Sequence, residues 1–310
     1  MFEPLRISAN NPGPMTGQGN HTYLLIGPRP ADGSIASATL IDAGVGDPAH
    51  LATVRFHLAD RRARLDRVLV THGHADHASG APSLADLSPT ARFAKYPWPD
   101  EDARYPVRWE PLVDGATIDA GGEPLQVRHT AGHSPDHVVF WHEPSRTAFT
   151  GDLVTEGSSV MIHWSGGGDL SKYLEALRLL IALEPAKLLP AHGPAIDDPV
   201  ATLTRYVEHR LSREAQVLEA LAGMLSSTLD RMRVDAARLC ELSEVEERFQ
   251  AISEASAIGF VKVGRDRTWQ YTSPMAAANS PTCQSRMAAT VASRSNNVPS
   301  RSKRTASITW

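Results

Sequence analysis

The sequence has few of the features that would place a protein in a membrane or outside the cell. Only two of its 310 residues are cysteines, Cys240 and Cys283, which is too few for a disulfide framework. No apolar run approaches the length of a membrane span, and the opening stretch Met1–Arg6 lacks the apolar core of a signal peptide. We therefore expect a cytoplasmic protein that does not bind membranes.

The chain also lacks an excess of positive charge. Its 31 Lys and Arg residues stand against 35 Asp and Glu residues, a formal net charge of −4. Such a balance gives no general attraction for nucleic acid or anionic lipid. The composition, 42% hydrophobic and 21% charged, is ordinary for a globular protein, and the length allows one large domain with an appendage.

What the chain does contain is a dense group of histidines directly after a short apolar stretch. The stretch is Val68-Leu69-Val70, and the group is Thr71-His72-Gly73-His74-Ala75-Asp76-His77. Packing does not explain three imidazoles beside a carboxylate, because a buried charge needs a partner. Neutral imidazole and ionised carboxylate are ligands of divalent cations, so the group predicts a metal site. A solvated histidine-rich turn is the alternative.

Three later segments each place one further ligand where an apolar stretch ends: His133, Asp152 and His192. The pattern H-x-H-x-D-H followed by His, Asp and His resembles the metallo-beta-lactamase superfamily over roughly residues 16–195. The loop at 11–16, Asn-Pro-Gly-Pro-Met-Thr, is similar to that of the beta-lactamase-like 2 group, which includes single-strand endoribonucleases, and to that of fungal polyketide thioesterases. In such proteins this loop borders the metal site.

The resemblance implies a fold of class α/β (α+β). Residues 1–200 would form an αββα sandwich, and residues 201–272 a helical, winged-helix-like appendage. Residues 273–310 are rich in Ser, Thr, Asn and Arg, and we expect them to be a disordered, dispensable tail.

The resemblance also implies two divalent ions, with zinc as the default and iron or manganese as alternatives. The ligands would be His72, His74 and His133 for one ion, Asp76, His77 and His192 for the other, and Asp152 as a bridge. Asp42 ends an apolar stretch. It would either accept a hydrogen bond behind the ligand histidines or merely cap a strand.

Hydrophobic periodicity and helix signals predict the other elements. Helices are expected at 48–60 and 75–87, between Asp169 and Pro185, and at 202–225 and 234–252, with two short strands within 258–271. Residues 88–115 are rich in proline and aromatics. They are expected to form a long irregular excursion, either a lid or a packed surface loop.

The implied reaction is hydrolysis by a hydroxide shared between the ions, with Asp76, His77 and Asp152 in direct contact with the chemistry. Two functions remain open. One is hydrolysis of small esters or thioesters, lactones included, in a pocket lined by Met15, Tyr23, Met161, His163 and Trp164. The alternative is a metal-dependent endoribonuclease for single-stranded RNA, which needs a basic, aromatic-lined channel.

Local charge favours the small-molecule hydrolase. The loops 10–20 and 156–168 contain no Lys or Arg, and residues 221–272 carry seven basic against eight acidic residues. Phosphate binding normally recruits several cations. We therefore expect a small-molecule substrate rather than nucleic acid, and a C-terminal region that serves structure or the formation of a homodimer.

Overall fold

The computed structural model describes residues 2–14, 16–255, 260–263 and 269–272. The chain divides into two compact units, the first ending at Glu214 and the second beginning at Ala215. The predicted tail at 273–310 lies outside the described residues. Within the described part, no helix combines the length and apolar character needed to cross a membrane.

The first unit contains two sheets. The six-stranded sheet has the order β1 (Leu5–Ser8), β2 (His21–Ile26), β3 (Ala36–Ile41), β4 (Ala63–Val70), β5 (Arg92–Lys95), β6 (Trp109–Pro111). Strands β1 to β3 pair antiparallel, and β3 to β6 pair parallel. The five-stranded sheet has the order β11 (Lys187–Pro190), β10 (Thr147–Gly151), β9 (Val138–His142), β8 (Glu123–His129), β7 (Thr117–Ala120).

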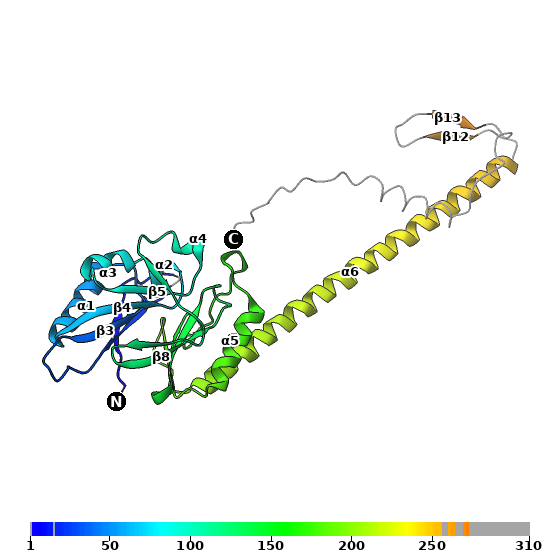
Figure 1. Ribbon diagram of the computed structural model, residues 1–310. Coiled ribbons are helices and arrows are strands. Elements are labelled where there is room, and N and C mark those ends of the chain that lie inside the picture. The colour runs from blue at the N-terminus through cyan, green and yellow to red at the C-terminus, as the bar shows by residue number, and fades with distance from the viewer. Residues whose placement is uncertain (1, 15, 256–259, 264–268, 273–310) are drawn as a thin grey trace. The chain divides into compact units, whose positions relative to one another are not determined.

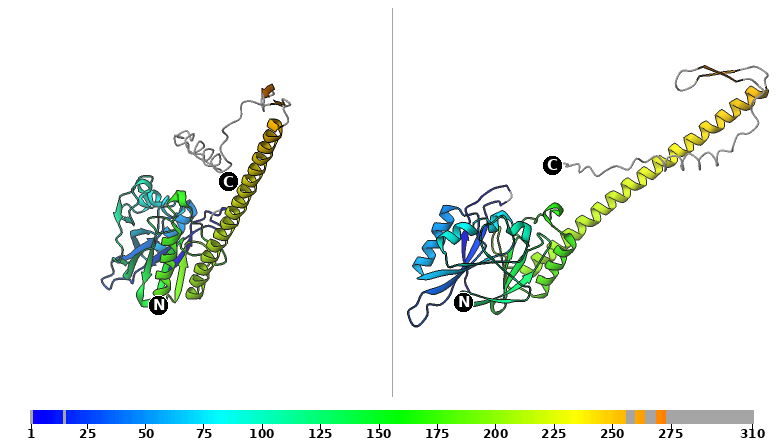
Figure 2. Two further views of the ribbon diagram at one scale, coloured as in Figure 1. Left: turned by 90° about the vertical axis from the view of Figure 1, so that its right-hand side faces the viewer. Right: turned by 45° about the horizontal axis from the view of Figure 1, so that its top comes forward.

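Helices cover the outer faces of the two sheets. Helices α1 (Pro48–Asp60) and α3 (Ala81–Leu87) lie on the side of the first sheet, and α5 (Leu170–Ala182) lies on the side of the second (Figure 1; Figure 2). Three apolar clusters fill the space between these layers. In the central cluster, residues of the two sheets pack together, for example Leu69 of β4 and Phe140 of β9. The predicted αββα sandwich is therefore confirmed.

Two predicted local features differ from the structure. The helix expected at 75–87 is interrupted between α2 (Ala75–Ala78) and α3, where a side chain at Gly80 would lie 2.1 Å from the carbonyl oxygen of Ala43. The stretch 88–115 is not irregular throughout, because it supplies β5, β6 and the short helix α4 (Pro99–Asp102). β5 forms because it pairs in parallel with β4. Pairing with a distant strand cannot be recognised from the local sequence.

The C-terminal helices expected at 202–225 and 234–252 are one continuous helix, α6 (Pro199–Ala255) (Figure 1). The polar residues between the two expected helices do not break it. Ser227 and Thr228 donate hydrogen bonds from their hydroxyls to backbone carbonyls one turn earlier, at Gly223 and Met224. The strands β12 (Phe260–Val263) and β13 (Trp269–Thr272) pair antiparallel, as expected.

The first turns of α6 belong to the first unit. Leu203 and Tyr206 are buried in the same cluster as the inner face of α5. This packing carries the first unit to Glu214, past the predicted boundary at residue 200.

Candidate metal centre

The candidate ligands follow the carboxyl ends of four strands. His72 to His77 follow β4, His133 follows β8, Asp152 follows β10 and His192 follows β11. The ligand atoms gather into two groups, in each of which all lie within 4.8 Å of one another. The histidine group is His72, His74 and His133, and the mixed group is Asp76, His77, Asp152 and His192.

In the histidine group, three ring nitrogens converge. Nδ1 of His74 lies 3.0 Å from Nε2 of His72 and 3.0 Å from Nε2 of His133. The opposite nitrogens of those two partners are already engaged. Nδ1 of His72 lies 3.1 Å from the hydroxyl oxygen of Thr71, and Nδ1 of His133 donates to the carbonyl of Met161 at 2.9 Å. This leaves the converging nitrogens as lone-pair donors.

Burial keeps two of these imidazoles, those of His72 and His74, neutral. It lowers the pKa of His72 well below its usual value, and His77 and His74 lower it further. Burial and the neighbouring His133 lower the pKa of His74 to about 4. Three ring nitrogens that face one another cannot all form hydrogen bonds, whereas a cation between them can bind all three.

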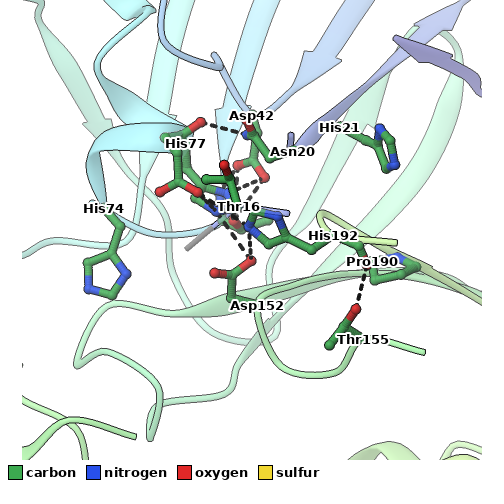
Figure 3. Close-up of polar contacts among 12 residues, drawn as sticks. Thr16, Asn20, His21, Asp42, His74, His77, Asp152, Thr155, Pro190 and His192 are labelled. Carbon is green, nitrogen blue, oxygen red and sulfur yellow. Dashed lines mark hydrogen bonds and ion pairs between the residues drawn. The ribbon is translucent and has the colours of Figure 1, made fainter. Parts of the chain in front are cut away.

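In the mixed group, two carboxylates face two imidazoles. Figure 3 labels three of these residues, His77, Asp152 and His192. Oδ1 of Asp152 lies 3.3 Å from Nε2 of His77 and 3.2 Å from Nε2 of His192. Oδ2 of Asp76 lies 3.5 and 3.3 Å from the same two nitrogens. The other oxygen of Asp152, Oδ2, is 3.6 Å from Nε2 of His133, so this carboxylate reaches both groups.

The mixed group contains buried polar atoms that no protein atom satisfies. Nε2 of His77 and Oδ1 of Asp152 have no hydrogen-bond partner. Although burial opposes it, Asp76 and Asp152 raise the pKa of His77 well above its usual value. Burial likewise opposes protonation of His192, but the carboxylates of Asp152 and Asp76 beside it raise its pKa to about 9. The two carboxylates therefore favour a positive charge at this place. A divalent cation would supply that charge and suits the nitrogen and oxygen donors of the group.

Asp42 lies behind the histidines and fixes their orientation. It takes the left-handed conformation at φ 61° and accepts hydrogen bonds from the amide and hydroxyl of Thr71 at 2.7 and 2.9 Å. Nδ1 of His77 donates to its Oδ2 at 2.8 Å. With the proton held on Nδ1, Nε2 of His77 is left to face the cation site.

His137, which is not part of the ligand pattern in the sequence, contacts the site. Its Nε2 accepts a hydrogen bond from the amide of Asp152 at 3.2 Å, and its Nδ1 donates to the hydroxyl of Thr130 at 2.8 Å. Gly151 makes this approach possible, since a Cβ there would lie 2.8 Å from Nε2 of His137. The four-residue spacing between His133 and His137 is the one available sequence signal.

The N-terminal loop borders the site, as the resemblance implies. The side-chain amide of Asn20 donates to the carbonyl of Asp76 at 2.6 Å. The same residue forms an isolated bridge with His192. Asn20 thus ties the loop to two candidate ligands from different strands.

Of the residues expected to line a substrate pocket, the four that the structure describes do not gather in one. Tyr23 does not line a pocket, contrary to expectation. It is 3% exposed, lies between the sheets and donates a hydrogen bond from its hydroxyl to the carbonyl of Pro190. Met161, His163 and Trp164 lie in an exposed loop, where Trp164 is 86% exposed. Met15 lies outside the described residues.

The excursion around α4 is attached to two loops that carry candidate ligands, and a buried ion cluster makes one of these attachments. Nζ of Lys95 lies 2.7 Å from Oδ2 of Asp136 and 2.5 Å from Oδ1 of Asp102, and the side chains of Lys95 and Asp136 are fully buried. The hydroxyl of Tyr105 donates to the carbonyl of Gly73, between His72 and His74. The excursion therefore contacts the loop that carries the candidate ligands His72 and His74.

Replacement of Lys95 by methionine should lower the free energy of unfolding by about 3–5 kcal/mol, because two carboxylates would lose their partner, one of them fully buried. The control is Lys187→Met, which removes a half-exposed lysine paired with an exposed Asp197 and should cost no more than about 1 kcal/mol. Urea denaturation of both variants measures the difference. An equal decrease in the free energy of unfolding for both variants would show that the buried ion cluster stabilises the fold no more than the exposed ion pair does.

A cavity of about 340 Å³ lies between the segment after β10 and the first turns of α6. Its lining includes Thr155, Ser158, Arg205, Tyr206 and His209, and none of the candidate ligands. Thr155 connects the cavity to the mixed group, since its hydroxyl donates to the carbonyl of His192 at 2.9 Å (Figure 3).

Comparison with known proteins places this arrangement in a family. Residues 23–192 match the family model described as the metallo-beta-lactamase superfamily. A beta-lactamase-like protein 2 homolog of Drosophila melanogaster is 31% identical over 240 residues, which cover 74% of this chain and 77% of that protein. An atrochrysone carboxyl ACP thioesterase, AgnL7 of Paecilomyces divaricatus, is 32% identical over 243 residues, which cover 78% and 69%.

A solved structure shows the same fold. The metallo-beta-lactamase family protein TTHA1429 from Thermus thermophilus superposes with a TM-score of 0.58 at 21% sequence identity, and the match covers 71% of this chain and 82% of that one.

Proposed function

The chain belongs to the metallo-beta-lactamase superfamily and to its beta-lactamase-like 2 group, and we propose that it hydrolyses small esters or thioesters at a site for two metal ions. Family and fold make it a metal-dependent hydrolase. The number of ions, their identity and the substrate are the proposed part.

The observation that carries the proposal is the pair of ligand groups joined by Asp152. The histidine group and the mixed group each offer converging donor atoms, and the two oxygens of Asp152 face opposite groups. The nitrogen-rich donor set suits zinc first, with iron or manganese as alternatives. Bound divalent ions would supply Lewis acidity, which lowers the pKa of water and polarises the carbonyl group whose carbon is attacked.

The protein's own residues prepare this chemistry. His72, His74 and His133 would hold one ion, and Asp76, His77 and His192 the other, with Asp152 shared. Asp42 keeps the proton of His77 on Nδ1. Attack of water on the acyl carbon breaks the C–S or C–O bond, and the products are a carboxylic acid and a thiol or alcohol.

Charge near the site supports a small substrate over RNA. Among the cations of the excursion, Lys95 is buried with Asp102 and Asp136. Arg104 pairs with Glu101. The nearby cavity of about 340 Å³ is at the lower end of the range for small-molecule sites. A relative whose name describes a carrier-protein thioesterase points in the same direction.

The test is a parallel assay of an acyl thioester, an aryl ester, a lactone and a single-stranded RNA oligomer at low and high salt. We expect turnover of the ester or thioester that changes little with ionic strength, because no phosphate chain has to be held. RNA cleavage that falls steeply with salt, without ester turnover, would overturn the proposal in favour of an endoribonuclease.

A further inference from the structure

From Leu211 onward, α6 exposes an apolar stripe with a seven-residue repeat. Leucine or methionine recurs at every seventh position of this helix, at Leu211, Leu218, Leu225, Met232 and Leu239. All five side chains are between 41% and 67% exposed. Leu221 and Leu242, three residues after two of them, widen the stripe and are 50% and 65% exposed.

A seven-residue repeat has a specific physical meaning. An α-helix has about 3.6 residues per turn, so a strict repeat of seven drifts by only about 20° per heptad and forms a slowly winding seam. Two helices with such seams bury them by supercoiling around each other, with the repeating residues at the first and fourth heptad positions. The seam is therefore suited to another helix with the same repeat.

We propose that this stripe joins two copies of the chain through a coiled coil formed by their α6 helices. A second copy supplies the same repeat over the same length, about 50 Å from Leu211 to Val245 at ~1.5 Å per residue. A lone helix would instead leave its apolar side chains in water, where they contribute nothing to its stability.

The area available is that of a stable dimer. The side chains at the seam and flanking heptad positions with large exposed apolar surface are Leu211, Val217, Leu218, Leu221, Met224, Leu225, Leu229, Met232, Leu239, Leu242 and Val245. At roughly 80 Å² buried for each of them, two helices would bury about 1,800 Å². Specific protein interfaces bury about 1,200–2,000 Å².

The polar residues at the fourth heptad positions limit how the helices can pair. Thr228 and Asp235 occupy these positions in the middle of the stripe. Asp235 has Arg231 one turn before it and Arg238 one turn after it, so its charge is balanced on its own helix. A polar layer of this kind weakens a coiled coil and favours one register, which is expected of a specific self-association.

The experiment is to measure the mass of the full chain by sedimentation equilibrium across a concentration range. We expect a dimer at micromolar concentration, and at least a 100-fold rise in the dissociation constant for the double variant Leu225→Glu/Met232→Glu. The matched control, Ser226→Glu/Ala237→Glu, adds the same charges at exposed positions off the seam and should remain dimeric.

Two results would overturn the inference. One is a monomeric wild-type chain at every concentration, which would mean that something other than a second copy covers the stripe, such as residues 256–310 of the same chain. The other is equal dissociation by the seam variant and its control. Circular dichroism at 222 nm is the second readout, since separated helices of this length lose helicity while the folded first unit retains its signal.

Discussion

Replacement of Asp152 by alanine should lower kcat on the substrate identified by the assay panel by about 1,000-fold or more. Its Oδ1 faces His77 and His192, and its Oδ2 faces His133, so its loss loosens both ligand groups at once. Residues that only orient a ligand typically cost about 10–100-fold when replaced, and a ligand shared by two ions should cost more.

The fold of the Asp152→Ala protein should survive, because the apolar clusters around both sheets do not include this residue. Circular dichroism and thermal melting establish folding. The control is Asp60→Ala, which removes an exposed carboxylate at the end of α1 that belongs to neither ligand group. A folded Asp152→Ala enzyme with near wild-type turnover would show that this carboxylate does not bridge.

Replacement of Asp42 by asparagine should weaken metal binding by about 10–100-fold. Asparagine is the informative variant because it tolerates the left-handed conformation that Asp42 adopts, so backbone strain does not confuse the result. Its side-chain oxygen can still accept from Thr71, but it loses the charge that holds the proton on Nδ1 of His77.

Competition with a chelator measures the affinity of the Asp42→Asn protein, and excess metal should restore part of the turnover. Unchanged affinity in this variant would mean that the carboxylate merely shapes the turn after β3.

The candidate ligands can be identified from the sequence because each is marked locally by the end of an apolar stretch. His72 follows an apolar strand of the six-stranded sheet, and Asp152 and His192 follow neighbouring parallel strands of the five-stranded sheet. The αββα layers follow from the same alternation of strands and helices, together with the family resemblance. Asp169 is an equally local signal, since its carboxylate accepts from the amide of Lys172 at the start of α5.

Features that depend on distant partners could not be predicted in this way. The ion cluster joins Lys95 to Asp136, 41 residues away, and no local pattern marks such a pair. Tyr23 has the composition of a pocket residue, but the facing sheet buries it. The contact between His137 and the amide of Asp152 likewise depends on how two loops meet.

The length of α6 shows a different limit. Ser226, Ser227 and Thr228 suggest a helix end because such residues compete for backbone hydrogen bonds. In the structure the hydroxyls of Ser227 and Thr228 bond to carbonyls of the preceding turn, so the helix continues. Absence of proline and continuity of the apolar repeat were the better signals.

The most direct measurement is the metal content of the full chain purified without chelator, determined together with that of His133→Ala and His192→Ala. Two ligand groups that share Asp152 predict about two equivalents for the wild-type chain, and a lower content for each variant because each change removes a ligand from a different group. A folded, active wild-type chain with one equivalent or none would contradict the two-metal site.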